Sequence, residues 1–405
     1  MANTRVTNPV TGFNSATEEG LKLPSGTNAN QPSGVQGMIR NDTGETTGSS
    51  ASAIEHHNGT NWQYFAATES PDNPFLASQN FNTVLYPGTG VSNPITGVGF
   101  QPDLIWVKRR TTSTANHYIV DTVRGNGTST YKNLSSDTTN VEGTTTSSGI
   151  TNSTIVDGGF TMQGNGARTN ASGSTYVAWC FKAGGAAVSN TDGSIPSQVS
   201  ANVANGFSIV KYTGSALIGN TVGHGLSSPP EMIIQKATST TRNWNVFNDD
   251  VGLSKNLHLN TTDSANTAEY WAVNSNTFAI QDQSASENRI AYCFHSVPGY
   301  SKVGSYTGNG STSTGNTINL GFEPAFIMIK NTTTTGSSSG WFMIDNKRNT
   351  SDPWDKYIFA NNNAAEGTTT QSLTSVGATS FTVKSSGRAI NYLGDNYIYM
   401  AFATS

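Results

Sequence analysis

The stretch PDLIWVK at residues 102–108 decides the fold, because the chain repeats it as PEMIIQK at 230–236 and as PAFIMIK at 324–330. Each copy starts with a proline, continues with an apolar run and closes with a lysine. Proline cannot donate to a β-ladder and therefore occurs at the first residue of a strand. A short apolar run is typical of a strand that is buried on both faces. We therefore expect three copies of a central strand, each with its lysine at the solvent-exposed rim.

Similar blocks of sequence surround each copy of this anchor in the same order. An alternating strand with a glycine-containing turn precedes the anchor, and an aromatic strand, a polar block and a closing strand follow it. The aromatic and closing blocks read NHYIVDTVR (116–124), RNWNVFNDD (242–250), GWFMIDNKR (340–348), YVAWCFKA (176–183), RIAYCFHS (289–296) and YIYMAFAT (397–404). A fixed order of blocks in three tandem copies indicates internal repeats, and several short strands in each copy are typical of an antiparallel sandwich.

The repeats also suggest how the chain is divided into domains. We predict an all-β fold class, with three tandem antiparallel β-sandwich domains of jelly-roll-like type after a small, β-rich N-terminal attachment module. The predicted boundaries are 1–80 for the module, 81–185, 205–297 and 299–405 for the repeats, and 186–204 for a linker without periodicity. The composition agrees, because aromatic residues favour strands and the 42 glycines favour turns.

Charge and hydropathy exclude several classes of partner. Only 12% of the residues are charged, with 22 Lys and Arg against 26 Asp and Glu. Nucleic-acid-binding proteins need a basic surface, so we expect no nucleic-acid partner. No apolar stretch approaches the length of a membrane span, and the first residues lack a basic segment followed by an apolar core. We therefore expect neither membrane insertion nor a signal peptide.

Residues 20–65 carry a pattern of their own. GLKLPSGTNANQPSGVQGMIRNDTG is followed there by IEHHNGTNWQYF. The Leu-Pro pair, the Gly-Thr pair, GMIRND and the tryptophan-containing segment resemble a small module of bacteriophage tail-fibre and appendage proteins. Asp42 and the insertion at 46–52 depart from the usual pattern of that module. The resemblance implies a strand followed by a hairpin, and a role of residues 1–80 in attachment and oligomerisation.

The three repeats are similar to uncharacterised modules in structural proteins of marine bacteriophages. The match rests on GFQPDLIWVK, VDTVRG, YKNLSSDTTN and YVAWCFKAGG in the first repeat, and the second repeat departs from these forms. Together the resemblances imply a virion protein, most simply a homotrimeric tail fibre or receptor-binding appendage on the outside of the particle. The implied partners are other virion proteins, bound through residues 1–80, and a glycan or protein of the host cell surface.

Three other roles stay open: a capsid decoration or head-fibre protein, a purely structural tail component, and an enzyme that cleaves surface polysaccharide. Such an enzyme needs a pair of carboxylates in a groove. Asp121 and Asp345 occupy equivalent positions of their repeats, but Asn248 occupies that position in the second repeat. A position that is Asn in one copy favours a hydrogen-bonding role, so we expect no catalytic residue and no enzyme activity.

No pattern predicts a cofactor or a metal ion. His56 and His57 are adjacent, so in a strand they point to opposite faces and cannot share one ion. Cys180 and Cys293 occupy the same position in two closing strands. Equivalent core positions of different domains lie beyond disulfide reach, so we expect two buried free thiols.

Candidate contacts with a host glycan come from tryptophans and polar turns. Tryptophans within strand patterns are expected in the core, and they are Trp106, Trp179 and Trp341. Two other tryptophans lie beside polar turn residues, where a ring could stack on a sugar. The candidate surface contacts are Trp354, Trp271, Asp352 and Asn331. The loop 331–340 of the third repeat completes this predicted site.

Overall fold

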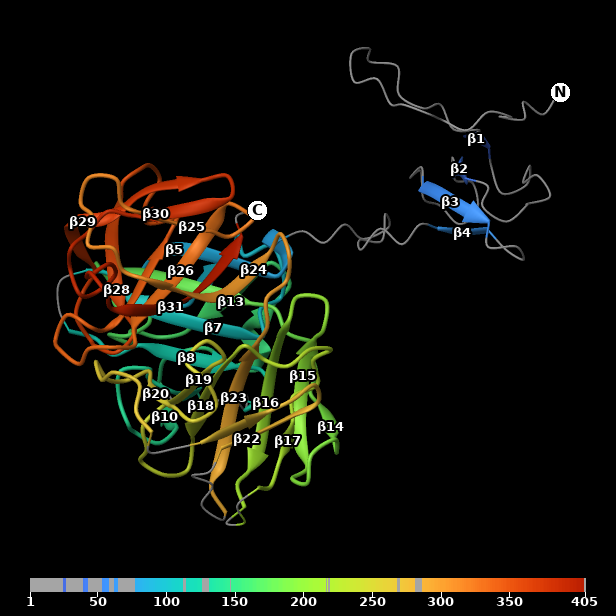
Figure 1. Ribbon diagram of the computed structural model, residues 1–405. Helices are drawn as coiled ribbons and strands as arrows, with labels where there is room; N and C mark the ends of the chain where they lie inside the picture. Colours follow the sequence, from blue (N-terminus) through green and yellow to red (C-terminus); the bar gives the residue numbers. More distant parts are fainter. Residues whose placement is uncertain are drawn as a thin grey trace, which may run out of the picture. The chain divides into compact units, whose positions relative to one another are not determined.

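Contacts between residues divide the chain into two units, Met1–Phe75 and Leu76–Ser405 (Figure 1). We call them the N-terminal unit and the body. In this computed structural model the described residues are 25–26, 39–42, 53–57, 62–64 and 77–403, with gaps at 112–113, 126–130, 146, 216, 218, 268–269 and 281–285. Their regular structure is almost entirely β, with two short 3-10 helices, η2 (Ala77–Gln79) and η3 (Asn152–Thr154).

The N-terminal unit contains one small sheet in the order β1-β2-β3-β4. Its strands are β1 (Ser25–Gly26), β2 (Ile39–Asp42), β3 (Ala53–His57) and β4 (Trp62–Tyr64). β1 pairs parallel with β2, and the other pairs are antiparallel. The strand and the hairpin implied by the resemblance are thus β2 and β3–β4.

Each repeat of the body builds a main sheet with the same strand order: first strand, closing strand, anchor strand, aromatic strand. In repeat 1 these are β5 (Phe81–Pro87), β13 (Thr175–Phe181), β7 (Leu104–Arg109) and β8 (Tyr118–Asp121). In repeat 2 they are β16 (Phe207–Thr213), β23 (Asn288–Phe294), β18 (Met232–Ala237) and β19 (Asn245–Asn248). In repeat 3 they are β24 (Ser301–Thr307), β31 (Asn396–Ala403), β26 (Pro324–Asn331) and β27 (Trp341–Asp345). All of these pairs are antiparallel.

Shorter strands complete each repeat, and some of them form a second layer that faces the main sheet. Repeat 1 has β6 (Asn93–Ile95), β11 (Ile155–Val156) and β12 (Gly159–Met162), and the separate pair β9 (Tyr131–Asn133) and β10 (Gly143–Thr145). Repeat 2 has β17 (Val222–Gly223), β21 (Trp271–Val273) and β22 (Thr277–Ile280), with β20 (Leu257–His258) extending its main sheet. In repeat 3 the layers are continuous through β28 (Trp354–Phe359), β29 (Gly367–Gly377), β30 (Ser380–Val383) and β25 (Asn316–Asn319). The fold class is therefore all-β and of the antiparallel sandwich type, as predicted.

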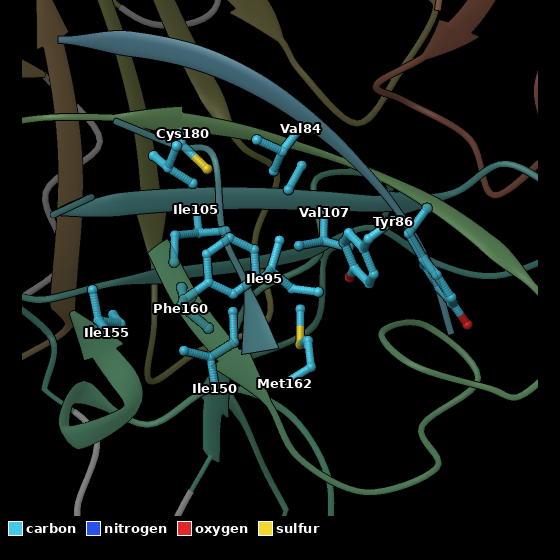
Figure 2. Packing of buried hydrophobic residues seen from close by; sticks show 14 of the residues in the cluster. Val84, Tyr86, Ile95, Ile105, Val107, Ile150, Ile155, Phe160, Met162 and Cys180 are labelled. Carbon is cyan, nitrogen blue, oxygen red and sulfur yellow. The ribbon is translucent and has the colours of Figure 1, made fainter. Parts of the chain in front are cut away.

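A hydrophobic core fills the space between the two layers of each sandwich. In repeat 1 it includes Tyr86 from β5, Ile105 from β7 and Phe160 from β12 (Figure 2). None of these residues is more than 5% exposed. The Cys180 side chain also points into this core, and Cys293 lies in the corresponding core of repeat 2. Both cysteines are free thiols, as expected.

The segment 186–204, predicted as a linker, instead belongs to repeat 2. Its strands β14 (Val188–Asn190) and β15 (Ser197–Asn202) form a hairpin, and β15 pairs along the whole of β16 except Thr213. Val199 of β15 is 3% exposed and packs in the core of repeat 2. The sequence concealed these strands because polar and small residues, which carry no periodic apolar pattern, dominate the segment.

The second face of each main sheet is buried against the other two repeats. Side chains of a closing strand alternate, so that Cys180 faces its own sandwich while Phe181 faces away from it. Phe181, Phe294 and Phe402 are equivalent residues of the three closing strands, and their ring centroids lie 5.3, 6.1 and 6.1 Å apart. The three repeats therefore surround a common pseudo-threefold axis, and each main sheet is covered on both faces.

The three anchor lysines connect neighbouring repeats, and the prediction that they lie at the wet rim is wrong. Lys108, Lys236 and Lys330 have no exposed surface. Each Nζ donates to a backbone carbonyl of another repeat: to Asn363 at 3.3 Å, Thr139 at 3.2 Å and Thr262 at 3.4 Å respectively. Burial lowers the pKa of Lys108 and of Lys236 to about 8, and that of Lys330 to about 7.

Aromatic side chains of the next block, which follows the anchor strand, connect the same pairs of repeats. The Trp244 indole donates to the carbonyl of Ser135 at 2.9 Å, and the Trp341 indole donates to the carbonyl of His258 at 2.9 Å. In repeat 1 the equivalent residue is His117, whose Nε2 lies 3.1 Å from the carbonyl oxygen of Phe359. Repeat 1 thus contacts repeat 3, repeat 3 contacts repeat 2, and repeat 2 contacts repeat 1. We call this closed arrangement the ring.

Candidate functional site

The two equivalent carboxylates considered for catalysis lie inside the ring. Asp121 and Asp345 each accept a hydrogen bond from the arginine three residues later, Arg124 at 2.5 Å and Arg348 at 2.6 Å. The Asp345–Arg348 side chains have no exposed surface. Each carboxylate also accepts a bond from the closing strand of another repeat, and these donors are Tyr292 for Asp121 and Trp179 for Asp345. Their hydrogen-bonding role agrees with the sequence interpretation.

The same position in repeat 2 lacks this network. Asn248 stands there, Val251 replaces the arginine, and Met400 replaces the closing-strand donor. Asn248 is 1% exposed, and neither atom of its amide group has a hydrogen-bond partner in the described part of the chain. Repeat 2 thus has neither the charged pair nor the Trp or Tyr donor at these positions.

Two of the predicted surface contacts lie in the interior and cannot reach a ligand. Trp271 is 4% exposed, packs on Phe247 and donates its indole N–H to Asn256 at 3.1 Å. Asn331 is fully buried: its amide donates to Asp395 at 2.8 Å, and its oxygen accepts the N–H groups of Thr333 and Thr334. Asn331 therefore shapes the start of the loop 331–340.

The other two predicted contacts, Asp352 and Trp354, lie together at a surface hollow of about 500 Å³. We call it the repeat 3 hollow. Its lining includes Glu323, Lys347, Thr350, Ser351, Asp352 and Trp354. Asp352 is exposed and accepts the backbone N–H of Val376 at 3.2 Å through one carboxylate oxygen. No sequence pattern points to Glu323 or Lys347. Glu323 precedes the anchor strand and Lys347 follows the aromatic strand, and they come together because β26 pairs with β27.

A second hollow, of about 1060 Å³, lies at the corresponding corner of repeat 1. Gln101 and Thr122 line it, and these residues are equivalent to Glu323 and Asn346 of the repeat 3 hollow. At its edge Asp103 accepts the N–H of Ala183 at 2.8 Å, which holds the segment after β13 in place. Burial raises the pKa of Asp103, although hydrogen bonds from Thr122 and Ala183 oppose the shift.

The described residues show little that could hold a metal ion or serve as a reactive thiol. They contain no group of three or more His, Cys, Asp or Glu side chains placed to bind an ion. His56 and His57 both lie in β3, and their side chains fall outside the described part. Burial raises the pKa of the Cys293 thiol to about 12 and that of the Cys180 thiol further, so neither is a ready nucleophile.

Over the described ranges, no helix has both the length and the apolar character needed to span a bilayer.

Comparison with curated proteins and with solved structures finds no match. A family model described as Domain of unknown function (DUF7483) matches residues 76–405, the same stretch that forms the body. The matched unit is therefore the whole ring of three repeats, and the chain belongs to the DUF7483 family.

Proposed function

We propose that the protein is an external structural component of a bacteriophage particle, a tail fibre or similar receptor-binding appendage that adheres to the host cell surface. The observation that carries the proposal is the division into a separate N-terminal unit and a ring of three related sandwiches. In this role the N-terminal unit attaches the chain to other virion proteins. The ring presents loops that differ between repeats, while the strands that the repeats share remain buried.

The buried interfaces of the ring also bear on self-association. Both faces of each main sheet are already covered within one chain, so the body has no need of further copies to complete its core. We expect the full-length chain to form a homotrimer through residues 1–80 and the body alone to be a monomer. Three bodies on one fibre would gain avidity from their effective concentration near the surface.

Two measurements test this proposal. Gold-labelled antibodies against the body should label the tail of purified phage particles that carry the gene for this protein. Purified full-length protein should bind host cells. Labelling of the head would favour the alternative of a capsid decoration or head-fibre protein. Tail labelling without cell binding would favour a purely structural tail component.

Light scattering tests the assembly directly. A full-length trimer and a monomeric body would support a fibre assembled through the N-terminal unit. A monomeric full-length chain would contradict self-assembly and would favour a decoration protein that takes its symmetry from the particle.

A further inference from the structure

The indole of Trp354 differs from those of the other tryptophans whose side chains the structure describes. Five of them donate their N–H to an atom of the protein, and they are Trp106, Trp179, Trp244, Trp271 and Trp341. Trp354 makes no such bond within the described part of the chain, and its Nε1 is not among the fully buried atoms that lack a partner, so this N–H reaches the surface. An indole N–H that reaches the surface can donate to water or to a ligand.

Trp354 forms part of the wall of the repeat 3 hollow, so its N–H can be satisfied from there. The exposed residues around it carry both donors and acceptors: hydroxyls on Thr350 and Ser351, carboxylates on Glu323 and Asp352, and the ammonium of Lys347. Among the described residues, no ion pair joins Lys347 to Glu323 or Asp352. The polar groups of this hollow therefore remain available to a ligand.

The loops make this hollow specific to repeat 3. Alignment of the polar blocks places Leu253 of repeat 2 and Thr130 of repeat 1 at the position of Trp354. The other repeats therefore lack this combination of an indole N–H and a carboxylate. Such a difference between repeats that share their buried residues indicates a role outside the core.

We propose that the repeat 3 hollow binds a saccharide, with Trp354 donating its indole N–H to a sugar oxygen and Asp352 accepting a hydroxyl. A sugar presents many hydroxyl groups and little net charge, which matches a hollow lined by hydroxyls, two carboxylates and one lysine. The volume of about 500 Å³ lies within the range of small-ligand sites. This inference rests on the proposed adhesive function and names the ligand class and the residues that would serve it.

Nuclear magnetic resonance of the full-length chain, with ¹⁵N-labelled tryptophan, tests the site. The probes are common bacterial hexoses, 6-deoxyhexoses, N-acetylhexosamines and their disaccharides, each added at millimolar concentration. The Trp354 indole signal is identified by its loss in Trp354→Phe. We expect that signal to shift with at least one probe, while the signals of the five bonded indoles stay in place.

Two variants sharpen the result. Trp354→Phe keeps an aromatic ring but removes the donor, and Asp352→Asn removes the charge but keeps an oxygen for the Val376 N–H. We expect each to weaken sugar binding by about three- to tenfold, the value of one hydrogen bond. Asp157→Asn makes the same change of charge in the hollow of repeat 1 and serves as the control, with unchanged affinity.

The proposal is overturned if no sugar moves the Trp354 signal, or if both variants bind the sugar as the wild type does. Cell binding, measured in parallel, separates this proposal from the adhesive function. Adhesion that both variants retain in full would overturn the sugar site and leave the function standing. A sugar-dependent shift in a protein that binds no cells would support the site and contradict adhesion.

Discussion

Repeats 1 and 3 differ from repeat 2 at the centre of the ring, although all three share one strand order. Repeats 1 and 3 bury an Asp–Arg pair that accepts a bond from a neighbouring repeat, whereas repeat 2 buries Asn248 beside Val251. A buried charge is tolerated when it is paired and hydrogen-bonded. The comparison teaches that a repeat contains both ions of the pair or neither of them. Either ion alone would be a buried, unpaired charge, which costs free energy.

The edges of the main sheets show a second difference. In repeats 1 and 3 the first strand is an edge, and an asparagine side chain caps it: Asn93 donates to the Pro87 carbonyl, and Asn316 donates to that of Thr307. In repeat 2 the hairpin of β14 and β15 covers the corresponding edge. A polar cap and an added strand are two ways to protect exposed backbone groups from unwanted pairing.

The largest effect is expected where the buried pair is broken. Asp345→Ala leaves the Arg348 guanidinium buried with its main partner removed, and we expect the free energy of unfolding to fall by about 3–5 kcal/mol. Asp121→Ala should behave similarly in repeat 1. Urea denaturation of the body measures both. A loss below about 1 kcal/mol for either variant would mean that the pair does not stabilise the ring.

The anchor lysines predict that stability depends on pH. Below about pH 7 the lysines carry a proton in both the folded and the unfolded chain. Above about pH 7 the lysines of the folded chain lose their protons at a lower pH than those of the unfolded chain. The reason is that the folded pKa of Lys330 is about 7, and those of Lys108 and Lys236 are about 8. The unfolded chain then binds more protons, so the free energy of unfolding rises with pH. We expect this rise between about pH 7 and 9.5, below the range where tyrosines of the unfolded chain ionise.

Lys330→Met isolates one contribution to that rise. The variant is destabilised overall, since the carbonyls of Thr262, Asn331 and Ser339 lose their donor. Its increase in stability between pH 7 and 9.5 should nevertheless be smaller than that of the wild type by about 2 kcal/mol. Urea denaturation at several pH values gives both curves, and parallel curves would contradict a lowered lysine pKa.

The interface tryptophans give a smaller effect with an internal control. Trp341→Phe removes the donor to the His258 carbonyl, and we expect a loss of about 2 kcal/mol. Trp354→Phe makes the same change where the indole has no acceptor in the described part of the chain, so its loss should be below about 1 kcal/mol. Equal losses for the two variants would mean that the bond between repeats adds nothing to stability.

The smallest effect is expected in repeat 2. Asn248→Leu removes a side-chain amide that makes no hydrogen bond with the described residues, and it supplies apolar surface beside Val251. We expect stability to stay the same or to rise by about 1 kcal/mol. A loss as large as that of Asp345→Ala would show that the three positions are equivalent after all. Thermal unfolding followed by circular dichroism is sufficient for this comparison.

The sequence predicted the strands of the ring better than their surroundings. The apolar runs of the repeated anchors locate β7, β18 and β26, because a strand buried on both faces must be apolar. The same pattern cannot distinguish burial within a sandwich from burial between repeats, so the ring and the buried lysines were missed. A lysine at the end of a strand normally reaches water, and only the carbonyls of another repeat make its burial tolerable.

The candidate site was predicted only in part for a related reason. Trp271 and Trp354 both stand beside polar turn residues, and local sequence does not reveal that an acceptor, Asn256, lies ready for one of them. Asp352 and Trp354 are close in sequence and therefore come together on the surface. Glu323 joins them only through the pairing of distant strands, which a pattern of residue types does not encode.

The central claim is that the three repeats form one ring and not three separate domains. Differential scanning calorimetry of residues 76–405 tests it most directly. The shared core and the cyclic bonds between repeats predict one cooperative transition, with equal calorimetric and van't Hoff enthalpies. Two or three separable transitions, or an unchanged melting temperature for a fragment that lacks repeat 3, would contradict the ring.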